Sequence, residues 1–350
     1  MESQLPFITI AMPVRNEERY IGELLNDLLK QDYPKDRYEI IVADGESTDC
    51  TRNIVKEVAR SNPQIVLLPN PGLLPSSGRN VGFKNGKGDF FLVIDGHCKI
   101  KNRQLLANLV DCFQKNGAHC LGRPQPFIVP EEATMQRAIA LARSSRLGHS
   151  TDSFIHSSKE GFVSPVSVGC VYKREVFEAI GFVDETFGAC EDVEFNYRVE
   201  KAGFKTFFSP RIAVYYYPRK DLKGLFRQLV RYGEGRIQFI CKHPETINLN
   251  MFLPLIFVAG IFSGPIVGLI NSYFLSFYLS ALLLYFIILF IESNRLSKGI
   301  GFHFASKLIL VFFAIHLSLG VGYIKGGAKS LLNRYFVRSL RVMKKKSSDA

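Results

Sequence analysis

The chain has 350 residues, enough for one large or two ordinary domains, and its composition is that of a globular protein. Its seven cysteines show no C-x-x-C spacing, which argues against a cysteine-ligated zinc site and against a disulfide framework. The formal net charge of +12 is concentrated in the tail, where residues 325–350 hold eight Lys or Arg and one Asp. Such a tail could bind nucleic acid, but "RVMKKK" follows hydrophobic segments, so we expect contact with anionic lipid and no nucleic-acid partner.

The first hundred residues alternate between strand and helix patterns. The runs "FITIAM", "YEIIVAD", "QIVLL" and "DFFLVID" are short and apolar, as is typical of buried strands. Between them lie "YIGELLNDLLKQ" with an apolar helical stripe, "STDCTRNIVKEVARSNP" with capping residues and a final proline, and the Gly-rich helical "SSGRNVGFKNGKG". This alternation predicts an α/β fold in which helices cover both faces of a parallel sheet.

Polar clusters follow three of the predicted strands. "PVRNEE" comes after the first, "DGESTD" after the second and "DGH" after the fourth. Taken alone, Asp95 in "LVIDGHC" is typical of an ordinary turn. Ligands of parallel sheets bind beyond the carboxyl ends of the strands, however, so we expect the three clusters to converge on one crevice.

Asp95 and His97 form the candidate metal site. In a strand, residues i and i+2 point the same way, so both side chains can face one cation while Gly96 lets the backbone come close. One carboxylate with one imidazole suits Mn²⁺ or Mg²⁺ whose other ligands come from a phosphate and water. A metal of this kind predicts a nucleotide substrate.

Other residues of the crevice have candidate roles. Asp44, at the end of the second strand, can accept a hydrogen bond from a base or ribose, with Asp49 as a weaker candidate, and Arg79 can neutralise a phosphate. Glu191 and Asp192 open a predicted helix in "GACEDVEFNYRVEKAGF", where acids commonly complement the helix dipole. The functional interpretation, compatible with that one, is that Asp192 accepts a proton from an attacking hydroxyl.

The pattern is weaker between residues 100 and 220. It predicts helices near residues 104–115 and 131–146 and a strand near residues 119–122. The polar stretch "GHSTDSFIHSSKEG" is expected to be a mobile loop, and "FKTFFSP" and "IAVYYYP" resume strand character.

Four stretches together resemble the family 2 glycosyltransferases, whose nucleotide-sugar-binding fold is called GT-A: "ITIAMPVRNEERYI", "IIVADGESTDCT", "GRNVGFKNGKGDFFLVIDGH" and "GACEDVEFNYRVEKAGFKTFFSP". The chain is most similar to membrane-attached bacterial enzymes of exopolysaccharide assembly, of the succinoglycan type, over about residues 7–245. The resemblance implies that Asp44 contacts the nucleotide base, that Asp95 begins the metal-binding D-x-D motif and that Asp192 is the catalytic base. His97 departs from the common motif, which has Asp there, although D-x-H also occurs among such enzymes.

The expected site therefore has four parts. The donor side comprises Pro13, Arg15, Glu17, Asp44, Ser47, Arg79 and Asp95. The metal ligands are Asp95 and His97, the catalytic candidates are Asp192 and Glu191, and Gln228, Arg231 and Tyr232 resemble an acceptor-side Q-x-x-R-aromatic motif. The last three lie in "KDLKGLFRQLVRYGEGR", an amphipathic helix that can lie in the membrane interface or belong to an ordinary core.

Two long charge-free runs predict membrane segments. Residues 251–291 carry no charged side chain and are long enough for two transmembrane helices divided around Asn271 and Ser272, the alternative being a buried hairpin of a soluble domain. A third crossing at residues 308–324 would export the basic tail, so we expect a re-entrant or interfacial segment there, with a full crossing as the alternative. The expected organisation is a catalytic domain over residues 1–219, an amphipathic interface segment over 220–250, a transmembrane region over 251–326 and a basic cytoplasmic tail over 327–350.

The leading hypothesis is an inverting glycosyltransferase of the inner or plasma membrane, multi-pass, with a cytoplasmic catalytic domain and no signal peptide. It moves a sugar from a nucleotide-diphosphate donor, with uridine as the expected base, to a lipid-linked or glycan acceptor in exopolysaccharide or cell-surface glycan assembly. In the implied mechanism a divalent cation, Mn²⁺ or Mg²⁺, stabilises the leaving diphosphate while Asp192 activates an acceptor hydroxyl. The alternative is a catalytically silent, membrane-tethered sugar-nucleotide binder or scaffold, against which the presence of both Asp95 and Asp192 argues.

Overall fold

The computed structural model describes residues 5–132, 134–149 and 154–348. The chain divides into two compact units, the first formed by residues 1–129 and 149–218 and the second by residues 130–148 and 219–350. The second unit thus takes in residues 130–148, which lie within the segment expected to be catalytic. Each unit is described by itself.

The first unit is built on an eight-stranded sheet in the order β3-β2-β1-β4-β8-β6-β9-β7. Its strands are β1 (Ile8–Val14), β2 (Tyr38–Asp44), β3 (Ile65–Pro69), β4 (Phe90–Val93), β6 (Cys120–Arg123), β7 (Gly161–Val163), β8 (Gly169–Lys173) and β9 (Thr206–Phe208). Strands β1 to β4 are mutually parallel, and β8 runs antiparallel to both β4 and β6. Because β9 is parallel to β6, six strands end at the same edge of the sheet.

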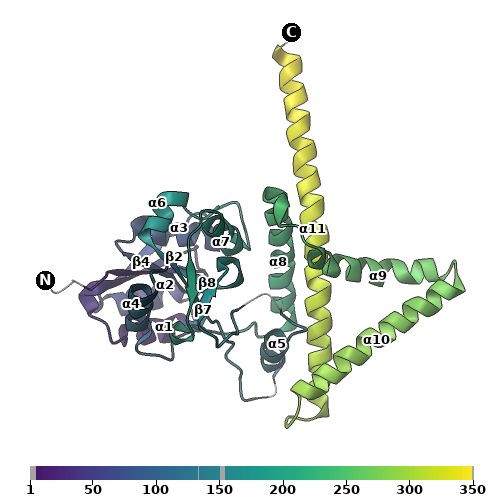
Figure 1. Cartoon of the computed structure of the whole chain (residues 1–350), viewed down its shortest axis with the longest axis horizontal. Helices are drawn as coiled ribbons and strands as arrows, with labels where there is room; N and C mark the ends of the chain where they lie inside the picture. The colour runs from purple at the N-terminus through teal and green to yellow at the C-terminus, as the bar shows by residue number, and fades with distance from the viewer. Residues whose placement is uncertain (1–4, 133, 150–153, 349–350) are drawn as a thin grey trace. The chain divides into compact units, whose positions relative to one another are not determined.

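Helices cover both faces of this sheet, as the sequence predicts (Figure 1). One face packs against α1 (Ile21–Leu29), α2 (Thr51–Ala59) and α4 (Leu105–Asn116), and the other against α3 (Pro75–Asn85), α6 (Arg174–Ile180) and α7 (Glu191–Lys201). Side chains along β1 point alternately to the two faces, so both faces are apolar and need covering. Ile10 and Met12 belong to the first core, and Ala11 between them belongs to the second. The α/β prediction with a doubly covered sheet is confirmed.

Helix α3 approaches the sheet unusually closely, which explains its glycines. A Cβ at Gly82 would lie 2.4 Å from Cβ of Ala11, and one at Gly78 would lie 2.8 Å from Cβ of Pro13. Only glycine leaves room for the backbone at these two positions. The close contact holds the intervening Arg79 against the edge of the sheet.

Two local expectations are wrong. Strand β4 ends at Val93, where its pairing with β1 also ends, and residues 95–97 form a turn into β5 (Cys98–Lys99), so Asp95 and His97 do not share a strand face. β5 pairs instead with β10 (Tyr215–Tyr216). Helix α5 (Met135–Ser144) is shorter than the predicted 131–146, because Thr134 caps its start by accepting from the amide of Arg137. The polar loop of residues 148–161 lies partly outside the described residues.

The second unit is helical. It contains α5, α8 (Leu222–Lys242), α9 (Leu253–Gly268), α10 (Ser272–Leu296) and α11 (Phe302–Ser348), with short 3₁₀ turns at Pro244–Thr246 and Leu249–Phe252. The first unit has 3₁₀ turns at Lys35–Arg37, Pro165–Ser167 and Pro210–Ile212. Helices α8 and α11 pack backbone against backbone: a Cβ at Gly322 would lie 2.3 Å from the carbonyl oxygen of Val230, and one at Gly233 would lie 2.6 Å from that of Leu319.

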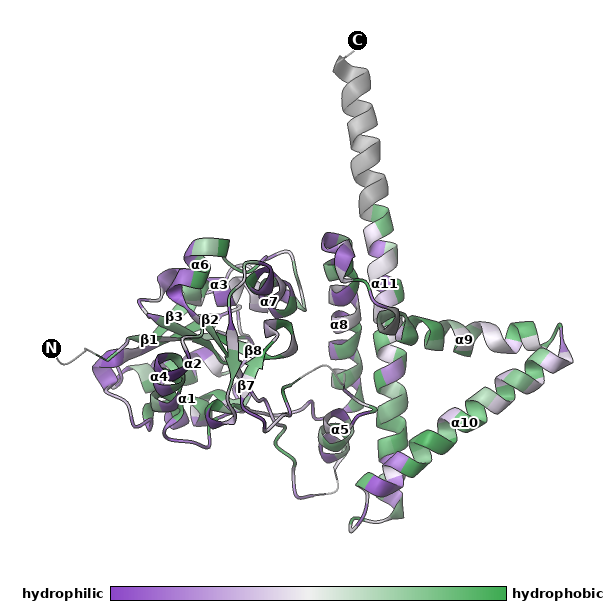
Figure 2. Cartoon of the chain, viewed as in Figure 1, coloured by the Kyte–Doolittle hydropathy of each residue, from purple (hydrophilic) through white to green (hydrophobic). Residues whose placement is uncertain are grey.

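Two helices of the described chain are long and apolar enough to cross a membrane by length and composition, Ser272–Leu296 and Phe302–Leu332. Helix α9 is shorter. The predicted division of the apolar run at Asn271 is confirmed, because Asn271 caps α10 by accepting from the amides of Tyr273 and Phe274. Figure 2 shows the apolar colouring of α9 and α10, and large side chains where these helices meet are almost fully exposed: Leu269 (88%), Ile270 (82%) and Tyr273 (87%). Residues 308–324 are part of one unbroken helix, and the number of crossings stays a prediction.

Candidate active site

The loops at the carboxyl edge of the sheet have an uncommon backbone. Four non-glycine residues in the described part of the chain have positive φ: Asn16 (58°), Glu46 (55°), Leu73 (60°) and Cys190 (62°). The first three follow β1, β2 and β3, and the fourth immediately precedes α7. A left-handed conformation costs roughly 1–2 kcal/mol per such residue, and strain of this kind clusters at functional sites.

The loops after β1 and β2 are joined by side-chain hydrogen bonds. The amide of Asn16 donates to Oγ of Ser47 (2.9 Å), and Oδ1 of Asn16 accepts from the amide of Thr48 (2.8 Å). Asp44 is 4% exposed, accepts from the amide of Ser47 (3.2 Å) and lies 3.4 Å from Nε of Arg52. The predicted residues Asp44 and Ser47 therefore belong to one braced pair of loops.

Asp49 also takes part in this bracing. Its carboxylate accepts from the amides of Thr51 (3.0 Å) and Glu18 (3.1 Å). Burial alone would raise its pKa, but these hydrogen bonds outweigh burial and lower the pKa of Asp49 below its ordinary value. Of the other donor-side candidates, Pro13 is buried in β1 under α3, whereas Arg15 is exposed at the start of the following loop.

His97 is held by Glu17 across 80 residues of sequence. Its Nδ1 lies 2.7 Å from Oε1 of Glu17, and a Cβ at Gly96 would lie 2.7 Å from Cγ of the same glutamate. The ring rests edge-on against Tyr216, with centroids 4.6 Å apart. Its Nε2 is buried and has no hydrogen-bond partner among the described residues.

The Nε2 of His97, unpartnered among the described residues, fits one ligand position of a divalent cation. A carboxylate on one ring nitrogen fixes the tautomer and leaves the lone pair of the other free for a metal. The Asp95 side chain is 29% exposed, so its carboxylate is accessible. No group of three or more His, Cys, Asp or Glu side chains in the described ranges could hold a metal, so other ligands would have to come from the substrate or water.

Arg79 lies among three carboxylates from two distant parts of the sequence. Its Nη1 lies 3.1 Å from Oε1 of Glu191 and its Nη2 lies 3.8 Å from Oδ1 of Asp95. Burial lowers the pKa of this guanidinium, but Glu191, Asp192 and Asp95 together raise it above its ordinary value. The structure thus brings Asp95, Arg79, Glu191 and Asp192 into one cluster.

The charges of this cluster do not balance. Burial raises the pKa of Glu191 above its ordinary value, and Asp192 and Asp95 add to the effect, while Arg79 opposes it. The pKa of Glu191 is therefore raised even though this residue pairs with Arg79, whereas an ion pair alone would lower it. The reason is that three carboxylates share one guanidinium, and Glu191 is the most deeply buried of them.

Helix α7 holds Glu191 and Asp192 in place. Phe195 is fully buried, and Asn196 accepts from the hydroxyl of Tyr172 (2.6 Å) and donates to the carbonyl of Val168 (3.2 Å). Asp192 accepts from the amide of Val193 (2.9 Å) at the first turn. Its carboxylate thus lies at the amino-terminal end of α7.

Arg123 is a site residue that the sequence analysis misses. It ends β6 at the same edge and is 5% exposed, and its Nη2 donates to the carbonyl of Val93 (3.0 Å). Its Nε and Nη1 are buried without a hydrogen-bond partner in the described chain. Burial lowers the pKa of this guanidinium, with Cys98 and Asp95 opposing the effect, and Arg79 lies near enough to add repulsion. The signal in the sequence is a charged residue followed by proline directly after the predicted strand of residues 119–122.

The acceptor-side candidates lie on α8 of the second unit. Gln228 is 3% exposed; its Nε2 donates to the hydroxyl of Tyr232 (3.2 Å) and its Oε1 accepts from Arg143 (3.5 Å). Arg231 is exposed on the same helix. The structure therefore links Gln228 and Tyr232, with Arg231 on the accessible side.

Comparisons with known proteins identify the family. The family described as "Glycosyl transferase family 2" matches residues 9–181, and "Glycosyl transferase family group 2" matches residues 105–321. The succinoglycan biosynthesis protein ExoA of Rhizobium meliloti is 31% identical over 269 residues, covering 76% of this chain and 78% of the relative. This chain belongs to glycosyltransferase family 2. It is therefore a glycosyltransferase, and the predicted resemblance to the succinoglycan-type enzymes is confirmed.

Two further proteins support the assignment. A dolichyl N-acetyl-alpha-D-glucosaminyl phosphate 3-beta-D-2,3-diacetamido-2,3-dideoxy-beta-D-glucuronosyltransferase of Methanococcus voltae is 30% identical over 325 residues, covering 91% of this glycosyltransferase and 97% of the relative. The mannosyltransferase PcManGT of Pyrobaculum calidifontis, solved with GDP-mannose and Mn²⁺, has a TM-score of 0.56 at 17% identity, covering 93% of this chain and 88% of that one. The latter shows that the GT-A fold is shared.

Proposed function

We propose that this glycosyltransferase moves a sugar from a nucleoside-diphosphate donor to a lipid-linked glycan acceptor, with inversion at the anomeric carbon. The observation that carries the proposal is the cluster of Asp95, Glu191 and Asp192 around Arg79 at the carboxyl edge of the sheet. Open α/β sheets bind nucleotides at this edge. The cluster combines cations for a diphosphate with a carboxylate for a proton.

The donor diphosphate is assigned to Arg79 and Arg123. Arg123 is a buried cation with two unpaired nitrogens, a state that is costly unless an anion completes it. A diphosphate supplies acceptor oxygens in the fork geometry that guanidinium groups match. Asp95 and His97 would hold Mn²⁺ or Mg²⁺, and such an ion supplies Lewis-acid stabilisation of the leaving diphosphate. Asp44 is assigned to the nucleotide base, for which uridine stays the expected identity.

Asp192 is assigned as the catalytic base. It lies at the start of a rigid helix, beside but not paired with Arg79, so its carboxylate is free to accept the proton of an acceptor hydroxyl. Attack on the face opposite the departing diphosphate inverts the configuration. Glu191, more deeply buried and paired with Arg79, positions that arginine instead of reacting itself.

A lipid-linked acceptor at a membrane agrees with the relatives and with the second unit. The Methanococcus voltae relative is named for a dolichyl-phosphate-linked sugar, and the Rhizobium meliloti relative for succinoglycan biosynthesis. Helix α10 and the apolar part of α11 meet the length that a membrane crossing requires. We infer that the enzyme is held in a cell membrane with its catalytic domain on the cytoplasmic side, in exopolysaccharide or cell-surface glycan assembly.

The test is a donor panel with the full-length enzyme in detergent. Nucleotide release from UDP- and GDP-sugars is measured with a lipid-phosphate-linked sugar acceptor, in Mn²⁺ and in EDTA. One donor should be turned over in Mn²⁺, and Asp192→Asn should lower kcat by roughly 10²–10⁴-fold, the usual contribution of a general base. Glu200→Gln, an exposed acid on the same helix, is the matched control. Turnover of Asp192→Asn at the parental rate would remove the base assignment, and no transfer from any donor would favour the silent scaffold.

A further inference from the structure

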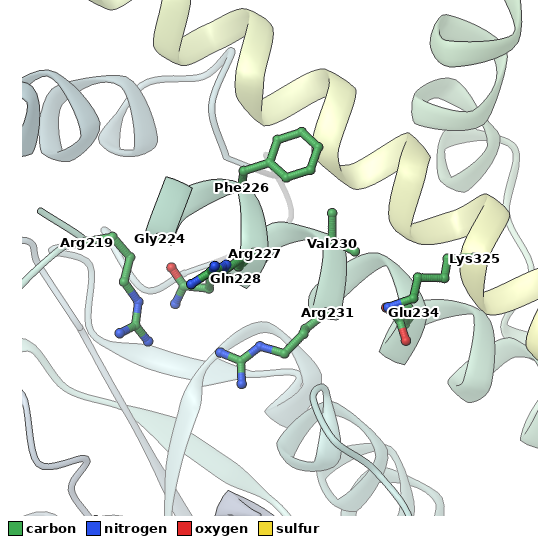
Figure 3. A pocket seen from close by; sticks show the side chains of 9 residues that line it. All are labelled: Arg219, Gly224, Phe226, Arg227, Gln228, Val230, Arg231, Glu234 and Lys325. Carbon is green, nitrogen blue, oxygen red and sulfur yellow. The ribbon is translucent and has the colours of Figure 1, made fainter. Parts of the chain in front are cut away.

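A groove of about 590 Å³ runs along helix α8. It is lined by Arg219, Gly224, Phe226, Arg227, Gln228, Val230, Arg231, Glu234 and Lys325 (Figure 3). All of these residues belong to the second unit. The groove therefore exists in that unit by itself, outside the sheet that holds the acidic cluster.

The groove carries positive charge that the chain does not compensate. Its one lining carboxylate, Glu234, pairs with Lys325 at 2.7 Å. Arg219, Arg227 and Arg231 have no ion pair or hydrogen bond from their side chains among the described residues. Three free guanidinium groups along one groove attract an anion, and each guanidinium group can donate two parallel hydrogen bonds to the oxygens of a phosphate.

An apolar row runs beside this basic row. Arg227 and Arg231 are four residues apart on α8, as are Phe226 and Val230 on the neighbouring stripe, so each pair lies one above the other. Figure 3 shows Phe226 and Val230 directed away from the guanidinium groups of Arg219 and Arg231. Helix α8 also packs tightly against α11, whose segment Phe302–Leu332 is apolar enough to cross a membrane. A ligand with a charged group and a hydrocarbon chain matches both rows.

We propose that this groove binds the diphosphate that links the acceptor sugar to an isoprenoid lipid. The proposal rests on the lipid-linked acceptor of the proposed function and deepens it by naming the anion and its site. Charge complementarity favours this ligand over a bulk phospholipid, because a diphosphate that links a sugar to a lipid carries two negative charges, whereas a phosphodiester carries one, and three unpaired cations suit the larger charge. Arg219, Arg227 and Arg231 hold the anion while the chain follows Phe226 and Val230 toward the membrane.

The experiment measures binding of farnesyl diphosphate to the full-length enzyme in detergent, with EDTA present so that metal-dependent binding of a diphosphate is removed. Arg219→Gln and Arg227→Gln should each weaken binding about tenfold, the loss expected for one charge-assisted contact. Lys223→Gln, an exposed cation of α8 outside the groove, should leave it unchanged. Inorganic diphosphate and farnesol should each bind more weakly than the joined molecule. In the transfer assay, Arg227→Gln should raise KM for the acceptor.

Parental binding by both arginine variants, or an equal loss in Lys223→Gln, would overturn the proposal. Equal competition by phosphatidylglycerol at the same charge concentration would also overturn it, since the groove would then be a general lipid contact. The two proposals fail separately. Binding that follows the groove arginines without any sugar transfer supports the groove and contradicts the proposed function, whereas transfer with an unchanged acceptor KM in Arg227→Gln does the reverse.

Discussion

Arg79 shows how a few charges organise the active site. One guanidinium faces three carboxylates, and burial makes each unpaired charge costly. The pair of Arg79 with Glu191 leaves Asp192 and Asp95 less compensated, so these two remain available for a proton and for a cation. A donor diphosphate with its metal adds charges of both signs and changes this balance.

The raised pKa of Glu191 predicts a pH-dependent stability. A carboxyl whose pKa is higher in the folded state contributes stability that is present below its ordinary value of 4.5 and is lost as pH rises through the folded pKa. The unfolding midpoint of the parent minus that of Glu191→Gln should therefore become smaller as pH rises from about 4.5 toward neutrality, because only the parent loses this stability. Thermal unfolding across this range checks it, with Glu200→Gln as control. A difference that stays constant with pH would contradict the burial argument.

Replacing Arg123 should weaken donor binding strongly while changing the stability of the fold only slightly. Arg123→Met removes a buried cation with two unpaired nitrogens and one backbone hydrogen bond, so the free energy of unfolding should change by only about 1 kcal/mol. Donor affinity should fall roughly 10- to 100-fold, because a charge-assisted contact to the diphosphate is lost. Calorimetric binding of the nucleoside diphosphate and thermal unfolding measure the two effects. Arg60→Met, at the exposed C-cap residue of α2, is the control. A variant with a clearly lower unfolding midpoint and parental donor affinity would make Arg123 structural.

The acids of the site could be predicted because of their position in the sequence. Asp44, Asp95 and the pair Glu191 and Asp192 follow strands or open a helix, and parallel strands bring such positions to one edge. Arg123 could not be assigned, since its place depends on β8 lying between β4 and β6, which no local pattern encodes. The contact of Glu17 with His97 is of the same kind, because it joins segments 80 residues apart.

At the scale of elements, the contact between α3 and β1 positions Arg79. Gly82→Val adds a side chain where a Cβ already lies 2.4 Å from Cβ of Ala11, so the helix must move away from the sheet. Overpacking of this kind costs about 1–3 kcal/mol, and donor affinity should fall with it because Arg79 moves. The unfolding midpoint and donor binding measure both, with Gly188→Ala, which has open space around it, as control. Parental donor affinity would show that this contact does not position Arg79.

The ends of elements were harder to predict than their existence. The strand pattern of "DFFLVID" continues through Asp95, but pairing to β1 ends at Val93 and the turn at Gly96 follows. Helix α5 begins at its Thr134 cap and not at the first helix-forming residue. By contrast, the division of the apolar run at Asn271 was predictable, because a polar capping side chain there is a local signal.

At the scale of the whole molecule, the exposed apolar helices predict membrane attachment. The exposed Leu269 and Ile270 before α10, together with the exposed apolar side chains of α10, would make the full chain aggregate without lipid. The enzyme should sediment with membranes, resist extraction by alkaline carbonate and be released by detergent. Leu283→Arg, at an exposed position within α10, should reduce the membrane fraction, because a charge at the helix centre costs about 2.5–3.5 kcal/mol of insertion. A parent chain that stays in solution without detergent would contradict membrane attachment.

We propose that Asp95 and Asp192, distant in the sequence, belong to one site in which a divalent cation and a diphosphate bind at Asp95 while Asp192 acts only on the acceptor. Calorimetric binding of a nucleoside diphosphate, with Mn²⁺ and with EDTA, tests it directly on the parent, Asp95→Asn and Asp192→Asn. We expect Mn²⁺-dependent binding that is equal in the parent and Asp192→Asn and at least about tenfold weaker in Asp95→Asn. Unchanged Mn²⁺-dependent binding by Asp95→Asn would contradict it.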